Sequence, residues 1–131
     1  MAVSRSQPPI RPIAEPVDFH FEEEPFEPNG LVVTVAGELD IATIPPVRDA
    51  LNAALATGMR QLVIDLRPLF FLDSIAVAAL LQVARQLGDE GRLAVVVDPD
   101  SYIRMVFEIA GLPQCLDVVE TREQGIAHVS G

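Results

Sequence analysis

The residues best suited to chemistry are a neighbouring aspartate and serine, Asp73 and Ser74, which lie where a helix is expected to begin. A serine hydroxyl at a helix N-terminus could accept a phosphoryl group, because the free N–H groups and the dipole of the helix stabilise the added negative charge. The pair also has an ordinary structural interpretation, since aspartate and serine are preferred at helix caps. A nucleophilic serine needs an adjacent base, and the two histidines, His20 and His128, lie near opposite ends of the chain. The chain itself is therefore not expected to catalyse the transfer.

A second acidic residue, Asp40, ends the segment GELD at 37–40 and is followed three residues later by Thr43. This segment and residues 67–73, which lead to Ser74, are expected to be loops, and each follows an apolar run typical of a buried strand. Because ligand sites of parallel sheets lie outside the carboxyl ends of the strands, Asp40 is expected to face the same surface as Ser74. Asp40 has the same structural alternative as Asp73, and Thr43 is expected to cap the helix that follows it.

The charge of the chain excludes two classes of partner. The 131 residues include nineteen acidic side chains and nine basic ones, all of them arginine, which gives a net charge of −10. Such a charge repels the phosphates of nucleic acids and of anionic lipids, so neither nucleic acid nor a membrane is an expected partner. No apolar stretch suits a leader or a membrane span, and the cytoplasm is the expected location.

The missing residue types exclude several kinds of chemistry. Without lysine the chain has neither a P-loop lysine nor a Schiff-base lysine. A single cysteine, Cys115, and two distant histidines predict no metal site. No cofactor and no enzymatic activity are expected.

The chain is expected to form one domain at residues 17–131, preceded by a flexible proline-rich tail at residues 1–16 whose removal should leave the folded core intact. Alternating apolar and polar residues predict a strand from Val17, with His20 on its solvated face. The acidic run at 22–24, with Pro25, Pro28 and an Asn-Gly pair, is expected to connect this strand as a hairpin to an apolar strand.

Strands and helices then alternate along the rest of the chain. Helices are predicted at 44–56, 74–87 and 102–110 and after Thr121, and strands at 31–36, 61–66, 93–97 and 116–119. Thr121 and Gln124 have the spacing of a capping box, and Asp100 or Ser101 is expected to cap the helix before Gly111. This order predicts an α/β fold with a mixed, mostly parallel sheet.

The helix predicted at 74–87 has one charged residue in fourteen, Arg85, which is few for a surface helix. Its expected buried stripe consists of Val77, Leu80, Leu81, Ala84 and Leu87, and its opposite face of Ile75, Ala78, Ala79, Gln82 and Gln86. That uncharged face is either covered by the protein's own chain or is a docking surface for a partner.

Four motifs together resemble the STAS domain, the family of bacterial anti-sigma factor antagonists. They are GELD at 37–40, LVIDL at 62–66, FLDS at 71–74 and IAGL at 109–112, and the resemblance covers residues 17–129. It implies a mixed sheet packed with helices and a switch operated by phosphorylation of Ser74. Members usually have Asp-Ser-Ser/Thr-Gly at the switch, whereas this chain has Ile75 and Ala76, and the Ala76 methyl group is expected where the kinase would approach.

The resemblance implies an anti-sigma factor serine kinase as partner, and a serine phosphatase as a further one. Binding would release a sigma factor, and the residues expected to contact the partner are Asp40, Thr43, Asp73, Ser74, Ile75, Ala78 and Gln82. Some STAS domains resemble scaffold proteins or small subunits of ATP-driven lipid transporters, in which Ser74 need not be phosphorylated. An enzyme or nucleotide binder is a third alternative, for which the chain offers no lysine, glycine-rich phosphate loop or catalytic base.

Overall fold

The computed structural model describes residues 19–131, so the predicted tail at 1–16 and the predicted strand start at Val17 lie outside the described residues. The described strands are β1 (His20–Phe26), β2 (Gly30–Leu39), β3 (Gln61–Asp65), β4 (Leu69–Leu72), β5 (Arg92–Val96) and β6 (Asp117–Val119). The described helices are α1 (Ile44–Ala56), α2 (Ser74–Leu87), α3 (Tyr102–Ile109) and α4 (Arg122–Ser130), with short 3₁₀ turns at Gly88–Glu90 and Leu112–Gln114. None of these helices has the length and apolar character needed to span a bilayer.

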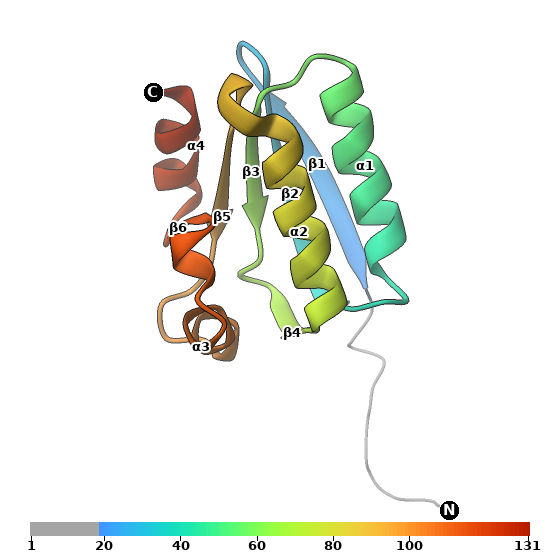
Figure 1. Ribbon diagram of the computed structural model, residues 1–131, viewed down its shortest axis with the longest axis vertical. Helices are drawn as coiled ribbons and strands as arrows, with labels where there is room; N and C mark the ends of the chain where they lie inside the picture. Colours follow the sequence, from blue (N-terminus) through green and yellow to red (C-terminus); the bar gives the residue numbers. More distant parts are fainter. Residues whose placement is uncertain (1–18) are drawn as a thin grey trace, which may run out of the picture.

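The six strands form one mixed sheet (Figure 1). Five of them lie in the order β1-β2-β3-β5-β6, and β4 pairs with the C-terminal end of β2. β1 runs antiparallel to β2, and the other pairs are parallel. The α/β fold with a mixed, mostly parallel sheet is therefore confirmed. Since β1 runs against β2, its first residues lie at the same end of the sheet as the end of β2.

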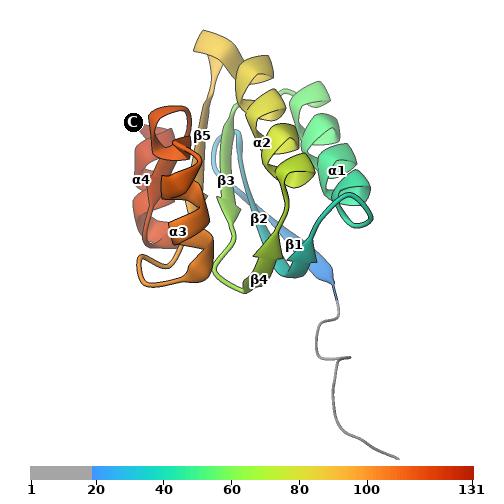
Figure 2. The same ribbon diagram turned by 60° about the horizontal axis from the view of Figure 1, so that its bottom comes forward.

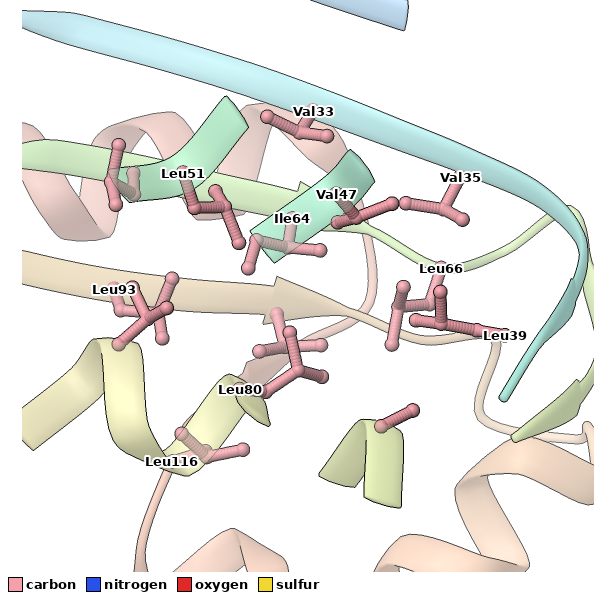
Figure 3. Packing of buried hydrophobic residues seen from close by; sticks show 14 of the residues in the cluster. Val33, Val35, Leu39, Val47, Leu51, Ile64, Leu66, Leu80, Leu93 and Leu116 are labelled. Carbon is pink, nitrogen blue, oxygen red and sulfur yellow. The ribbon is translucent and has the colours of Figure 1, made fainter. Parts of the chain in front are cut away.

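Side chains alternate between the two faces of the central strands and build two cores. On one face Val47 and Leu51 of α1 point toward Val33, Val35 and Ile64 of the sheet (Figure 3). Residues of α2 and α3 complete this larger core, in which Phe107 is fully buried. On the other face α4 covers a smaller core of valines and alanine from β2, β3 and β5.

The first hairpin forms, but its connection is shorter than predicted. The acidic run at 22–24 and Pro25, which were expected in the connection, belong to β1, and the turn is confined to residues 27–29. Glutamates are tolerated in this strand because β1 lies at the edge of the sheet, where side chains of both faces reach water. The hairpin closes with the Phe26 ring over Gly30, in the space that a Cβ atom at position 30 would occupy. That contact explains why a glycine opens β2.

The segments before Asp40 and Asp73 were predicted as loops, and this prediction is wrong for residues 37–39, which extend β2, and for residues 69–72, which form β4. Leu69 pairs with Gly37 and Leu72 with Leu39, with a register shift just after Gly37. Leu69 and Leu72 are buried whereas Phe70 and Phe71 are exposed. A run of four apolar residues does not reveal this division, because it lacks the alternation that marks a half-buried strand.

The predicted faces of α2 are also corrected. The buried residues are Ala76, Leu80, Val83 and Leu87, whereas Val77, Leu81 and Ala84 are only half-buried. The prediction gave weight to the larger apolar side chains and missed a stripe that begins with an alanine. The Ala76 methyl group lies in the core and not, as predicted, where a kinase would approach.

The opposite face of α2 reaches solvent. Ile75, Ala78, Gln82 and Gln86 are exposed, and Ala79 is half-buried. The described residues do not cover this face, and its use as a docking surface stays a prediction.

Candidate functional site

The loop before α1 and the beginning of α2 are held together by one carboxylate, that of Asp73. As the N-cap of α2, its Oδ1 accepts a hydrogen bond from the Ala76 N–H at 2.9 Å. Its Oδ2 accepts from the Ile41 N–H at 3.1 Å, across 32 positions of sequence. The Asp73 N–H in turn donates to the Leu39 carbonyl at 3.2 Å. Asp73 therefore fixes the position of the first loop relative to Ser74.

The loop before α1 has its own internal hydrogen bonds. Asp40 Oδ1 accepts from the N–H groups of Ala42 and Thr43 at 2.9 and 3.1 Å. Thr43 occupies the N-cap position of α1, but its hydroxyl does not cap the helix as predicted. It accepts from the Asp40 N–H at 2.9 Å and donates to the Glu38 carbonyl at 2.8 Å. The second and third residues of α1 are Pro45 and Pro46, which have no N–H, and the Ile44 N–H is bonded to the Asp40 carbonyl, so the helix start offers the Thr43 hydroxyl no donor to cap.

Ser74 is the first residue of α2, and its side chain is exposed. Its neighbour Ile75 has 45% of its surface exposed, and Ile41, whose N–H bonds to the Asp73 carboxylate, has 67%. The described hydrogen bonds do not join the Ser74 hydroxyl to a base. This arrangement offers a hydroxyl that an external enzyme could modify, at a helix N-terminus that favours negative charge.

The predicted site residues come together as one surface. Asp40, Thr43, Asp73, Ser74 and Ile75 lie at the carboxyl ends of β2 and β4 (Figure 2). Ala78 and Gln82 extend this surface along the exposed side of α2, four and eight residues after Ser74. Their contact with a partner stays a prediction.

The structure adds a buried ionic cluster that the sequence analysis missed. Asp65, at the end of β3, is 1% exposed. Its carboxylate accepts from Arg67 Nε and Nη2 at 3.0 and 2.8 Å and from Arg122 Nη2 at 3.4 Å. Arg122 also donates to Thr34 Oγ1 and Glu24 Oε1, both at 2.9 Å. The cluster ties β1, β2 and β3 to α4, and the lone aspartate within an apolar run was the signal that could have revealed it.

Opposing effects set the pKa of Asp65. Burial raises it, but hydrogen bonds from the Arg67 side chain and backbone, together with the charges of Arg67 and Arg122, outweigh burial and hold it below the usual value. The same hydrogen bond raises the pKa of the Arg67 guanidinium. Asp65 is thus ionised in the folded protein at neutral pH and lies on the α4 face of the sheet, away from Ser74.

The candidate site lies on the exposed surface of the protein, and the hollow beside the β1–β2 turn does not belong to it. A hollow of about 350 Å³ is lined by the β1–β2 turn and by residues 57–59. It lies at the amino ends of the parallel strands, opposite the end that carries Ser74. The geometry around Ser74 therefore suits recognition by a macromolecule.

Replacing Asp73 by alanine is expected to loosen the loop before α1 as well as the start of α2. The variant loses the cap bond, which contributes about 0.5–2 kcal/mol, together with the bond to Ile41. Ser101→Ala is the matched control, because Ser101 caps α3 through one bond to Arg104 N–H. Hydrogen exchange should speed up at Ile41 in Asp73→Ala only. Unchanged exchange at Ile41 would show that Asp73 does not hold the loop.

Comparison with known proteins agrees with this architecture. The family model for the STAS domain matches residues 22–125. The anti-sigma F factor antagonist of Lysinibacillus sphaericus is 32% identical over 114 residues, which cover 86% of this chain and 96% of that protein. The anti-sigma-B factor antagonist of Staphylococcus aureus is 26% identical over 91 residues, 70% of this chain and 84% of that protein.

Two solved structures extend the comparison to three dimensions. An anti-sigma factor antagonist from Mycobacterium paratuberculosis superposes with a TM-score of 0.80 at 27% identity, over 91% of this chain and 100% of that one. The Bacillus cell fate determinant SpoIIAA, in its phosphorylated form, gives 0.64 at 26% identity, over 83% and 98%. Sequence and fold agree, and the chain belongs to the STAS domain family, among relatives of the anti-sigma factor antagonists.

Proposed function

We propose that the protein is an anti-sigma factor antagonist that binds an anti-sigma factor of the serine-kinase type and so releases a sigma factor. Phosphorylation of Ser74 by that kinase ends the binding, and a serine phosphatase restores it. The protein acts as a binding module in the cytoplasm and has no catalytic turnover of its own.

The observation that carries this proposal is the exposed Ser74 hydroxyl at the first residue of α2, beside a loop that Asp73 holds in place. The names of the relatives support the antagonist role, and SpoIIAA has been solved in a phosphorylated form. Ala76 is buried and leaves the approach to Ser74 unobstructed, so the departure from the usual motif that bears on recognition is Ile75.

The test uses the full chain as bait in cytoplasm from its own organism. Without ATP, wild type and Ser74→Ala are both expected to capture one serine kinase, identified by mass spectrometry. With ATP, the wild type should gain one phosphate at Ser74 and release the kinase, whereas Ser74→Ala should stay unmodified and bound. Ser130→Ala, which removes an exposed serine at the end of α4, is the matched control and should behave as wild type.

Other outcomes would replace the proposal. A captured ATP-driven transporter would make the chain a transporter subunit. A stable partner with no phosphate on the bait would make it a scaffold. Phosphate on another residue would remove Ser74 from the switch.

A further inference from the structure

The exposed apolar side chains of the described residues lie on a few neighbouring segments. Four of these side chains lie on the segments that form the candidate site or lead into it: Ile41, Phe70, Phe71 and Ile75. The other large ones lie on α3: Tyr102, Met105 and Ile109. In the described part of the chain, β1 and α1 carry no exposed large apolar side chain. An apolar surface confined to one end of a protein marks an interaction site.

The candidate site alone is small for a protein interface. A stable interface of standard size takes roughly 20–30 residues from each partner. The seven residues of this chain that are expected to contact the partner, Ser74 among them, are about a third of that number. The interface must continue beyond them, and the exposed apolar side chains indicate the direction.

That direction is across β4 to α3, which packs against β4 (Figure 2). Ile103 and Phe107 of α3 point into the core. Tyr102, Met105 and Ile109 recur at intervals of three and four residues and form one stripe on the outer side of the same helix. Ile109 is 79% exposed, the highest value among the large apolar residues described.

The charges around these segments are mainly negative. Glu38, which pairs with Phe71, and Asp98 and Asp100, which precede α3, are exposed and form no ion pair with the described residues. The two arginines of these segments are already neutralised, Arg67 by Asp65 and Arg104 by Glu108. Complementary charge steers and orients association, so a suitable partner surface carries basic side chains at its rim.

We propose that the docking surface extends from Ser74 across Phe70 and Phe71 to the outer stripe of α3, and that the partner presents an apolar ridge bordered by basic residues. The kinase as occupant rests on the proposed function. The surface and its chemistry rest on the exposed apolar residues and the acidic rim.

The first arm of the test uses the captured kinase. Met105→Glu places a charge in the middle of the stripe, where the partner would have to desolvate it, and should weaken kinase binding tenfold or more. Asn52→Glu adds the same charge at an exposed position on α1, toward the opposite end of the sheet, and should bind as wild type. Equal affinity of both variants and wild type would overturn the proposal while leaving the proposed function intact. Thermal unfolding of each variant confirms that it is folded.

The second arm does not depend on the kinase. An 18-residue helical peptide with a leucine stripe bordered by arginines is titrated into isotope-labelled protein, beside a peptide with glutamates in place of the arginines. The arginine peptide alone should shift the amide resonances of residues 38–41, 70–75 and 102–109, and Met105→Glu should abolish the shifts. Shifts elsewhere, or equal shifts with both peptides, would overturn the proposed chemistry. If the arginine peptide shifts the amide resonances of α3 but no kinase is captured from the cytoplasm, the docking surface is supported and the proposed function is refuted.

Discussion

Phosphorylation of Ser74 is expected to weaken binding of the partner at least tenfold. The phosphate adds a charge of about −1.5 to −2 at neutral pH. It would lie next to the exposed side chain of Ile75 and near the loop that carries exposed Ile41, in a surface whose partner must exclude water from apolar groups. The Ala76 N–H is already bonded to Asp73, so the helix start offers the phosphate less compensation than a free N-terminus would. A loss of only ~1.4 kcal/mol in binding free energy produces the tenfold change.

Calorimetric titration of kinase with unmodified and fully phosphorylated protein measures this change. Ser74→Ala should bind as the unmodified protein does, because the hydroxyl has no hydrogen-bond partner among the described residues. Ser130→Asp adds negative charge far from the site and should leave the affinity unchanged. Equal affinities for both phosphorylation states would mean that the phosphate is not the switch.

Replacing Asp65 by asparagine is expected to lower the free energy of unfolding by about 2–3 kcal/mol at pH 7. The variant keeps the shape of the side chain but leaves Arg67 and Arg122 without their shared negative charge. These arginine side chains are 41% and 33% exposed, and water can solvate them, so the loss stays below that of a fully buried pair. Glu24→Gln removes only the exposed partner of Arg122 and should cost less than about 1 kcal/mol.

The difference between Asp65→Asn and wild type should depend on pH. The folded pKa of Asp65 is lowered, so the unfolded state binds a proton first as pH falls. The ionised carboxylate therefore stabilises the fold fully above the unfolded pKa of about 4, and this contribution is lost as pH falls through the lower folded pKa. Urea unfolding at a series of pH values should show a constant difference from pH 7 to 5 that closes below pH 4. A difference that persists unchanged in acid would show that packing, and not charge, is responsible.

Most of the fold was predictable because its strands and helices carry their own periodicity. The runs at 31–36 and 61–66 are apolar enough to mark buried strands, and capping residues mark the starts of α2, α3 and α4. β4 escaped prediction because a run of four apolar residues is short for a strand, and because its pairing with β2 is not local in sequence. The buried stripe of α2 was misplaced because Ala76 is small.

The candidate site was predictable in its location but not in its connections. Parallel strands bring their carboxyl ends to one edge, which places Asp40 and Ser74 on one surface. The bond from Ile41 to Asp73 joins residues far apart in the chain, and no local pattern indicates it. The role of Asp65 escaped for the same reason, since its partner Arg122 lies 57 positions away.

The position of β1 at the edge of the sheet affects the solubility of the protein. Under the proposed function, the protein must be present at a concentration similar to that of the partner it captures. At such concentrations, a strand whose outer edge has no partner is a template for aggregation. Glutamates at 22, 23 and 24 place charge on both faces of β1, and Pro25 has no N–H to offer a neighbouring strand. The same residues that made this segment look like a connection therefore keep the outer strand from recruiting further copies.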